Sequence, residues 1–375
     1  MKNKTIKFIY SVSIFMIVLA FSVCSSTPQP KSNVIERTTG KTVFSFSTNQ
    51  PDTAIVNVPK KINDLRLVNP DEFIRQLALY IKKDTNNDFR IVKRIHDWIA
   101  LNIRYDAKSY LSGVIPFQGY YNTLVSGMAV CAGYADLFKR ICDELNIDCK
   151  EVSGHARGYS YSLFDEEKIT SNHAWNMVMI YDNLYLIDCT WDSGYLDGTR
   201  QVQKYTTDYL FIKPERIIYS HFPIWQTDQL LNPPISEDEF LNMPAYRPLF
   251  FNYITEVKPS PGKIIKMDGR TKINFYVNDN TYLMFEVSNK YGKEIQDKNK
   301  ICKFGNIGNR YEADFTFTET GEYIFRLYAS NEKYGTHKWI AEYGIIVTSG
   351  YVPTANDIRR NEIEESIKKG LVNPK

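Results

Sequence analysis

Several common catalytic and ligand-binding motifs are missing from this chain of 375 residues. No Cys-x-x-Cys pair is present, so a structural zinc site of the usual kind is not expected. The Gly-x-Ser-x-Gly turn of serine hydrolases, a phosphate-cradling glycine loop and the His-Glu-x-x-His zinc motif are also absent. We therefore expect chemistry that needs neither a metal nor a cofactor.

The chain also has little net charge. The formal net charge is +3, and Lys2, Lys4 and Lys7 account for it, so the rest of the chain is neutral. A near-neutral body gives no case for binding nucleic acid or an anionic membrane surface. The hydrophobic fraction of 43% and the aromatic fraction of 14% exclude a disordered protein, and the length allows two domains.

The first 24 residues have the pattern of a secretory signal peptide. Three lysines precede an apolar run from Phe8 to Val23, which is short for a membrane span. Cys24 follows directly, where bacterial lipoproteins carry their lipidated cysteine. We expect export to the cell envelope, with Cys24 as a lipidation candidate that would attach the protein to a membrane. Ordinary cleavage nearby, giving a secreted or periplasmic protein, is the alternative.

Helical patterns dominate the region after a linker at 25–65, which is rich in Ser, Thr, Asn and Pro. Helices are predicted from Asn69-Pro70, from Asn87-Asp88 and from Cys131, and residues 107–127 between the last two are predicted to be a loop. The three apolar faces are Phe73, Leu77, Tyr80 and Ile81; Ile91, Ile95, Trp98 and Ile99; and Tyr134, Phe138, Ile141 and Leu145.

Strand patterns follow the third helix at residues 149–153, 174–181 and 183–189. Asp182-Asn183 is the predicted hairpin turn between the last two. Helices followed by short antiparallel strands predict an α+β domain over residues 66–245.

A second region, residues 250–350, reads as strands separated by Gly, Asn and Asp turns. About 100 residues of this pattern predict an immunoglobulin-like antiparallel β-sandwich. The charged tail at 351–375 is predicted to be a surface helix or a disordered end. The expected strands are 273–277, 282–288, 313–318, 323–329 and 338–348.

Cys131, His173 and Asp188 carry the chemistry that the sequence suggests. A helix N-terminus lowers the pKa of a thiol, and the thiolate is the reactive form. An imidazole can accept the thiol proton, and a carboxylate can hold that imidazole in the right tautomer. His173 and Asp188 lie at similar distances from the predicted turn, so an antiparallel hairpin would place them side by side.

Each member of this triad has a structural alternative. Cys131 could be a buried structural cysteine, because free cysteine is among the most buried residue types. His155 is the rival base, and Asp192 is the rival for the orienting carboxylate. The other histidines, His96, His221 and His337, are weaker candidates.

An acyl-transfer site also needs donors for the oxyanion. The backbone amide of Cys131 is the default donor, and Gln118, Trp175 and Trp191 are the side-chain candidates, of which Gln118 is preferred. The remaining cysteines leave their pairing open, with at most two bridges among them. They are Cys142, Cys149, Cys189 and Cys302.

The strings around these residues resemble the transglutaminase-like superfamily. The matching strings are Ala129-Val130-Cys131-Ala132-Gly133-Tyr134-Ala135, His173-Ala174-Trp175-Asn176 and Asp188-Cys189-Thr190-Trp191. Downstream, Tyr209-Leu210-Phe211, His221-Phe222-Pro223 and Trp225-Gln226 are similar to the kyphoscoliosis peptidase branch. The resemblance implies a papain-like core, with Cys131 as nucleophile, His173 as base and Asp188 as orienting acid.

The resemblance implies a thioester intermediate without fixing the reaction. Together with the N-terminal signal, it leads to our first hypothesis, an exported thiol hydrolase, a cysteine peptidase acting on protein or peptide amides. Protein cross-linking by transfer to an amine and an inactive cell-surface binding module are the alternatives. The peptide-glycanase branch carries a Cys-x-x-Cys pair, and its absence here argues against that activity. Asp192 stands where the family often has glycine, so it could change the charge beside Asp188. The oligomeric state is not indicated.

Overall fold

A computed structural model describes residues 49–165 and 168–369. The signal-peptide prediction, including Cys24, falls outside these residues. Within them, no helix combines the length and apolar character needed to cross a bilayer. Of four hydrophobic clusters in the described residues, the two largest lie in the helical region and in the C-terminal strands.

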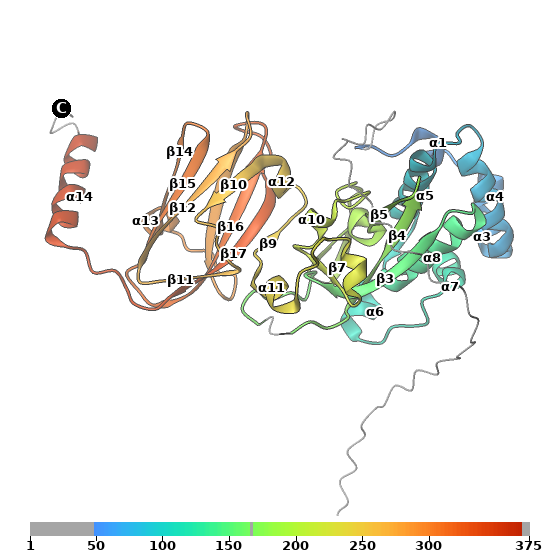
Figure 1. Cartoon of the computed structure of the whole chain (residues 1–375), viewed down its shortest axis with the longest axis horizontal. Coiled ribbons are helices and arrows are strands. Elements are labelled where there is room, and N and C mark those ends of the chain that lie inside the picture. The colour runs from blue at the N-terminus through green and yellow to red at the C-terminus, as the bar shows by residue number, and fades with distance from the viewer. Residues whose placement is uncertain (1–48, 166–167, 370–375) are drawn as a thin grey trace, which may run out of the picture. The chain divides into compact units, whose positions relative to one another are not determined.

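Three helices form the main helical layer, as predicted. Helix α4 (Pro70–Lys82) begins where the Asn69 side chain accepts a hydrogen bond from Glu72 N, and α5 (Asp88–Asn102) begins with the same arrangement at Asn87. Helix α8 (Cys131–Glu144) packs against both and lies on the sheet that follows (Figure 1). Its buried face fixes the position of its first residue, Cys131.

The sheet beneath α8 has four antiparallel strands in the order β5-β4-β3-β8. The hairpin turn lies one residue earlier than predicted, at Tyr181-Asp182. Both residues have positive φ, 49° and 61°, as a two-residue type I′ turn requires, and Ile180 pairs with Asn183. The strands are β3 (Cys149–Ala156), β4 (His173–Ile180), β5 (Asn183–Ile187) and β8 (His221–Pro223).

The segment predicted to be a loop, residues 107–127, contains two short helices. In α6 (Ala107–Ser112) the Asp106 side chain accepts from Ser109 N, and in α7 (Tyr120–Ser126) Leu124 is buried in the core. Gly113 and Gly127 end them in the left-handed conformation, so the glycines that suggested a loop are helix terminators. Strands β1 (Arg104–Tyr105) and β2 (Met128–Ala129) flank the segment and pair in parallel.

Part of the predicted linker also belongs to the folded core. Ile55 in α1 (Thr53–Val56) and Ile62 in α2 (Lys60–Asn63) are buried, and α3 (Leu65–Val68) follows. Asp52 pairs with the buried guanidinium of Arg94 at 3.0 Å. The buried residues of this segment do not recur at helical or strand spacing, so the sequence pattern could not reveal them.

Short elements connect the sheet to the C-terminal region. Thr190, Trp191 and Asp192 follow Asp188 in the first of these helices, at the edge of the site. The elements are α9 (Cys189–Ser193), β6 (Gly194–Asp197), β7 (Arg200–Gln203), α10 (Pro214–Ile217), the 3₁₀ helix η1 (Gln226–Gln229), α11 (Glu237–Asn242), β9 (Ala245–Tyr246) and α12 (Phe250–Tyr253).

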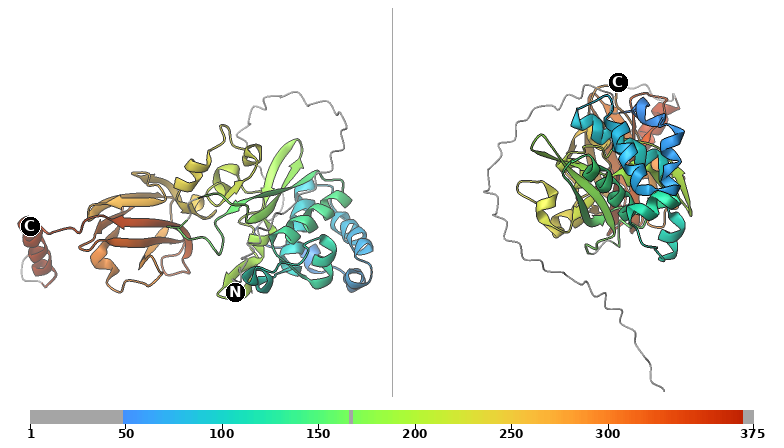
Figure 2. Two further views of the ribbon diagram at one scale, coloured as in Figure 1. Left: turned by 90° about the horizontal axis from the view of Figure 1, so that it is seen from below. Right: turned by 90° about the vertical axis from the view of Figure 1, so that its right-hand side faces the viewer.

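The C-terminal strands form the predicted sandwich of two sheets, ordered β10-β12-β15-β14 and β11-β17-β16-β13 (Figures 1 and 2). All pairings are antiparallel except β11 with β17. The strands are β10 (Ile254–Lys258), β11 (Ile264–Met267), β12 (Arg270–Val277), β13 (Tyr282–Asn289), β14 (Cys302–Ile307), β15 (Arg310–Thr316), β16 (Gly321–Ser330) and β17 (Lys338–Val347), with helices α13 (Lys298–Ile301) and α14 (Ala355–Lys368).

Candidate active site

Cys131 is the first residue of α8, at a helix start that no side chain caps. The amides of this first turn and the helix dipole therefore favour negative charge at this point. Because Gly133 has no side chain, Thr123 and Gln118 in the preceding segment can lie close to the first turn of α8. A Cβ there would lie 2.6 Å from Thr123 Oγ1 and 2.9 Å from Gln118 Oε1.

His173 and Asp188 are joined by a short hydrogen bond. His173 begins β4, Asp188 follows β5, and His173 Nε2 lies 2.7 Å from Asp188 Oδ2. Asp188 Oδ1 accepts from the backbone N–H groups of Thr190 at 2.8 Å and Trp191 at 3.2 Å. The carboxylate is thus the N-cap of α9, and its orientation is fixed by backbone donors.

The electrostatics of the three groups are coupled. Burial opposes ionisation of Cys131, but the charge of His173 and its hydrogen bond to the sulfur outweigh burial and lower the pKa of the thiol. Burial also opposes the imidazolium, yet Asp188 and Cys131 raise the pKa of His173 to about 10. Asp188 is fully buried, and His173 nevertheless holds its pKa below the usual range. This arrangement favours a thiolate–imidazolium pair at neutral pH.

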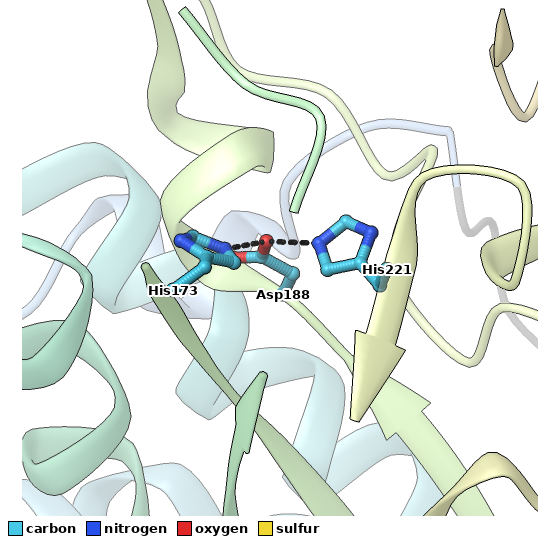
Figure 3. A group of neighbouring side chains, drawn as sticks. All are labelled: His173, Asp188 and His221. Carbon is cyan, nitrogen blue, oxygen red and sulfur yellow. Dashed lines mark hydrogen bonds and ion pairs between the residues drawn. The ribbon is translucent and has the colours of Figure 1, made fainter. Parts of the chain in front are cut away.

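His221 is the residue that the sequence reasoning undervalued. Its Nε2 lies 3.1 Å from the same Asp188 Oδ2, so the carboxylate sits between two imidazole rings (Figure 3). Its Nδ1 lies 2.8 Å from Ser220 Oγ. β8, which carries His221, pairs with β3 beside the triad strands, a long-range pairing that local sequence patterns do not reveal.

Aromatic rings surround this hydrogen-bonded group. The ring centroid of Trp191 lies 4.4 Å from that of His221 and 5.5 Å from that of His173. Trp175 stacks on His173 with a centroid distance of 6.0 Å. The indole Nε1 of Trp175 is buried and has no hydrogen-bond acceptor among the described residues. The rings exclude water, which strengthens the interactions between the charged groups.

Gln118 lies at the helix start but uses its polar atoms for local contacts. Its Oε1 accepts from Val130 N at 2.8 Å, and its Nε2 donates to Pro116 O at 2.9 Å. Gln118 thus fastens the preceding loop to the residue before Cys131. Gln118 Nε2 carries two N–H groups, of which Pro116 accepts one, whereas the single indole N–H of Trp175 has no acceptor among the described residues.

The two rival residues are occupied elsewhere. His155 Nδ1 contacts the backbone of Thr170 at 3.1 Å. Asp192 accepts from His96 Nε2 at 3.0 Å, and His96 Nδ1 lies 3.1 Å from Asp97. Asp192 therefore does not orient His173, and the added carboxylate belongs to a separate buried network.

The open question of disulfide pairing has a direct answer within the described residues. Cys131 and the four cysteines whose pairing was left open are all free thiols. Only Cys131 is partly exposed, and the other four are buried.

His173, Asp188 and His221 are also the one group of three side chains in the described residues with spacing suited to a metal. Their ligand atoms lie within 4.8 Å of one another. A zinc ion there would replace the proton that each imidazole directs at Asp188. It would also remove His173 from its role beside Cys131. The hydrogen bonds already account for all three residues.

Two family models match the chain in consecutive regions. Residues 75–191 match the transglutaminase-like superfamily, and residues 237–354 match the KY-like immunoglobulin-like domain. The chain therefore contains a transglutaminase-like domain followed by a KY-like immunoglobulin-like domain. The transglutaminase-like match includes the predicted triad and ends before His221.

Curated proteins are similar to this chain over part of its length. Kyphoscoliosis peptidase of Mus musculus is 28% identical over 220 residues, covering 58% of this chain and 33% of that protein. Hillarin of Drosophila melanogaster is 27% identical over 135 residues, covering 32% and 16%. The chain spans about a third of the length of the first of these relatives.

Solved structures include a TGase that is 19% identical, with a TM-score of 0.26, over 36% of this chain and 34% of that one.

Proposed function

We propose that this protein is a thiol hydrolase that cleaves amide bonds of proteins or peptides through Cys131, His173 and Asp188. The observation that carries the proposal is the His173–Asp188 hydrogen bond of 2.7 Å beside a thiol whose pKa the imidazole lowers. A binding module would have no use for this ionised group. The name of the related kyphoscoliosis peptidase is consistent with hydrolysis of peptide bonds.

The geometry supports a two-step reaction. The Cys131 thiolate attacks the carbonyl carbon, and donors at the helix start stabilise the oxyanion that forms. His173 gives its proton to the departing amine, the carbon–nitrogen bond breaks, and a thioester remains on Cys131. His173 then removes a proton from water, the oxygen attacks the thioester, and the carbon–sulfur bond breaks, so that the acid leaves and Cys131 returns to the thiolate. Asp188 holds the His173 ring throughout and stabilises the imidazolium whenever it forms.

Side-chain donors for the oxyanion can be ranked by their contacts. The backbone amide of Cys131 remains the default donor, because no side chain caps the helix start. Trp175 offers a buried N–H without an acceptor, whereas Gln118 already donates to Pro116. Trp191 covers the His173–Asp188 pair with its ring. We assign the second donor to Trp175.

Alkylation of Cys131 by iodoacetamide across pH tests the ion pair without a known substrate. An unperturbed thiol titrates near about 8.5, whereas an imidazole-paired thiol should react well below about 7. We expect fast alkylation at low pH in the wild type, and its loss in His173→Ala. A wild-type profile near the unperturbed value would contradict the proposal.

Product analysis separates hydrolysis from cross-linking. We expect new N-termini in a panel of unfolded proteins, and none with Cys131→Ala. A labelled primary amine added to a glutamine-containing protein should not be incorporated. Incorporation beyond hydrolysis would instead establish acyl transfer to an amine, with the same triad.

We further propose export with lipidation at Cys24, on the basis of the N-terminal sequence alone. Expression in a bacterial host should place the protein in the membrane fraction, and Cys24→Ser should release it. A soluble wild-type protein cleaved near this residue would support ordinary secretion.

A further inference from the structure

One contact at Asp188 is not used by the proposed mechanism. Oδ2 accepts from two imidazoles, His173 at 2.7 Å and His221 at 3.1 Å. The carboxylate and the ring of His221 are both fully buried. A buried polar contact of this kind is costly unless every partner is satisfied, so His221 is part of a complete hydrogen-bond network.

The protonation state of His221 follows from its surroundings. Burial outweighs the attraction of Asp188 and lowers the pKa of His221 to about 4, and the nearby rings of His173 and His155 act in the same direction. The ring is therefore neutral near pH 7. Because Asp188 can only accept, Nε2 carries the proton, and Nδ1 is free to accept from the Ser220 hydroxyl, whose oxygen lies 2.8 Å from it and 3.2 Å from Ile217 O.

We propose that His221 is a positioning residue that shares Asp188 with His173 and so sets the pH range of the Cys131–His173 ion pair. This inference rests on the proposed function. An N–H donated to a carboxylate favours its charged form and disperses its negative charge. A carboxylate that keeps only one imidazole donor is more basic.

The sign of the effect can be worked out. Without the His221 donor, Asp188 attracts the imidazolium more strongly, so the pKa of His173 rises. The same concentrated negative charge repels the thiolate, so the pKa of Cys131 rises as well. The alkylation rate of Cys131 plotted against pH has two limbs, one set by the pKa of Cys131 and one by that of His173. Both limbs move to higher pH. A residue that only packs against Trp191 would change the overall rate without moving either limb.

Two variants of the full-length protein separate these possibilities. His221→Phe keeps a ring beside Trp191 but removes the donor. His221→Gln keeps an N–H near the position of Nε2. Iodoacetamide alkylation of Cys131 between about pH 3 and pH 11 is the readout, with thermal unfolding as the check on folding. Ser220→Ala, which removes the hydroxyl beside Nδ1, is the milder third variant.

We expect His221→Phe to move both limbs upward by about half a pH unit or more, and His221→Gln to restore most of the wild-type profile. Ser220→Ala should shift them in the same direction by less, and it carries the test if His221→Phe does not fold. The proposal would be overturned if the folded variants kept the wild-type alkylation profile of Cys131. It would also be overturned if the profile of His221→Gln shifted as far as that of His221→Phe.

Two further outcomes keep the alternatives apart. A wild-type thiol that titrates near about 8.5 would mean that the proposed function itself fails. A low, His173-dependent wild-type profile that His221→Phe leaves unchanged would overturn only the role of His221. A wild-type profile that shifts on adding a zinc chelator would replace the proposal with a metal bound by His173, Asp188 and His221.

Discussion

Trp175 occupies an unusual position at the residue scale. It lies two residues after His173 in β4, so both side chains project from the same face of the strand. Its ring stacks on the imidazole, and its buried N–H has no acceptor among the described residues. A buried donor without a partner costs about 1–3 kcal/mol. A group that forms only during the reaction, such as an oxyanion, would satisfy it.

Trp175→Phe should therefore lower turnover and leave thiol ionisation unchanged. The phenyl ring can still stack on His173, while the donor is lost. We expect kcat to fall about 100–1000-fold, the range for removal of one oxyanion donor, with the alkylation profile of Cys131 unmoved. Steady-state kinetics on a cleaved peptide would measure this.

Gln118→Ala is the comparison for that experiment. It removes the contacts to Val130 and Pro116 together with an amide that has a second N–H to offer. A loss of kcat larger than that of Trp175→Phe would return the oxyanion role to Gln118.

The sequence could predict the triad because each member lies in a distinctive local string. Cys131 opens an amphipathic helix, and His173 and Asp188 lie in one hairpin, so their proximity needed only the hairpin turn. His221 could not be found in this way. It reaches Asp188 through the pairing of β8 with β3, between residues more than 60 positions apart. Asp192 stayed a rival to Asp188 for the same reason, because its partner His96 lies on α5.

At the scale of elements, the contact between α8 and the segment before it depends on Gly133. Gly133→Ala would place a methyl group against Ala129, Thr123 and Gln118, at 2.6, 2.6 and 2.9 Å. Overpacking of this kind costs about 1–3 kcal/mol. We expect a lower midpoint of urea unfolding and slower alkylation of Cys131, because the helix start must move.

Gly305→Ala is the matched control for this substitution. Gly305 lies in β14, and no atom lies within 4 Å of where its Cβ would be. Its variant should keep the wild-type midpoint or exceed it slightly. Equal losses in both variants would show that backbone freedom, not packing at α8, decides the effect.

A buried charge network joins α5 to α9. Burial disfavours charge on His96, but hydrogen bonds to Asp192 and Asp97 outweigh it and raise its pKa to about 9. A group with a raised folded-state pKa contributes stability that is fully present below the unfolded value of about 6.5. That contribution is lost as pH rises through about 9.

Asp192→Asn tests this network, because the amide can still accept from His96 without supplying charge. We expect it to be less stable than wild type by about 1 kcal/mol or more near pH 6, with a smaller difference near pH 9.5. Urea unfolding at both pH values measures the two differences. A deficit that is constant with pH would mean that the carboxylate does not hold the charge on His96.

The elements themselves were predictable where periodicity was strong. Helices α4, α5 and α8 each bury a stripe of apolar residues at helical spacing, and Asn69 and Asn87 marked two of their starts. Helices α6 and α7 were missed because they are only one to two turns long and end in glycine. In such short elements, tertiary contacts rather than periodicity decide the conformation.

For the molecule as a whole, the free thiols lead to a clear prediction. Burial raises the pKa of Cys142, Cys189 and Cys302, so they should not react in the native state. Brief alkylation of the native protein should label Cys131 alone among the five described cysteines, and alkylation after denaturation should label all five. Peptide mass spectrometry would identify each site. Two cysteines that remain unlabelled after denaturation without reductant would reveal a disulfide.

The position of β8 has a practical consequence for anyone who trims this protein to its smallest working fragment. The transglutaminase-like match ends at residue 191, a natural place to cut. A fragment ending there would retain all three side chains of the proposed triad but would expose one edge of β3, which β8 covers from His221 to Pro223. Unpaired strand edges recruit other chains and cause aggregation. The boundary for a soluble fragment should therefore be set by the last strand of the sheet.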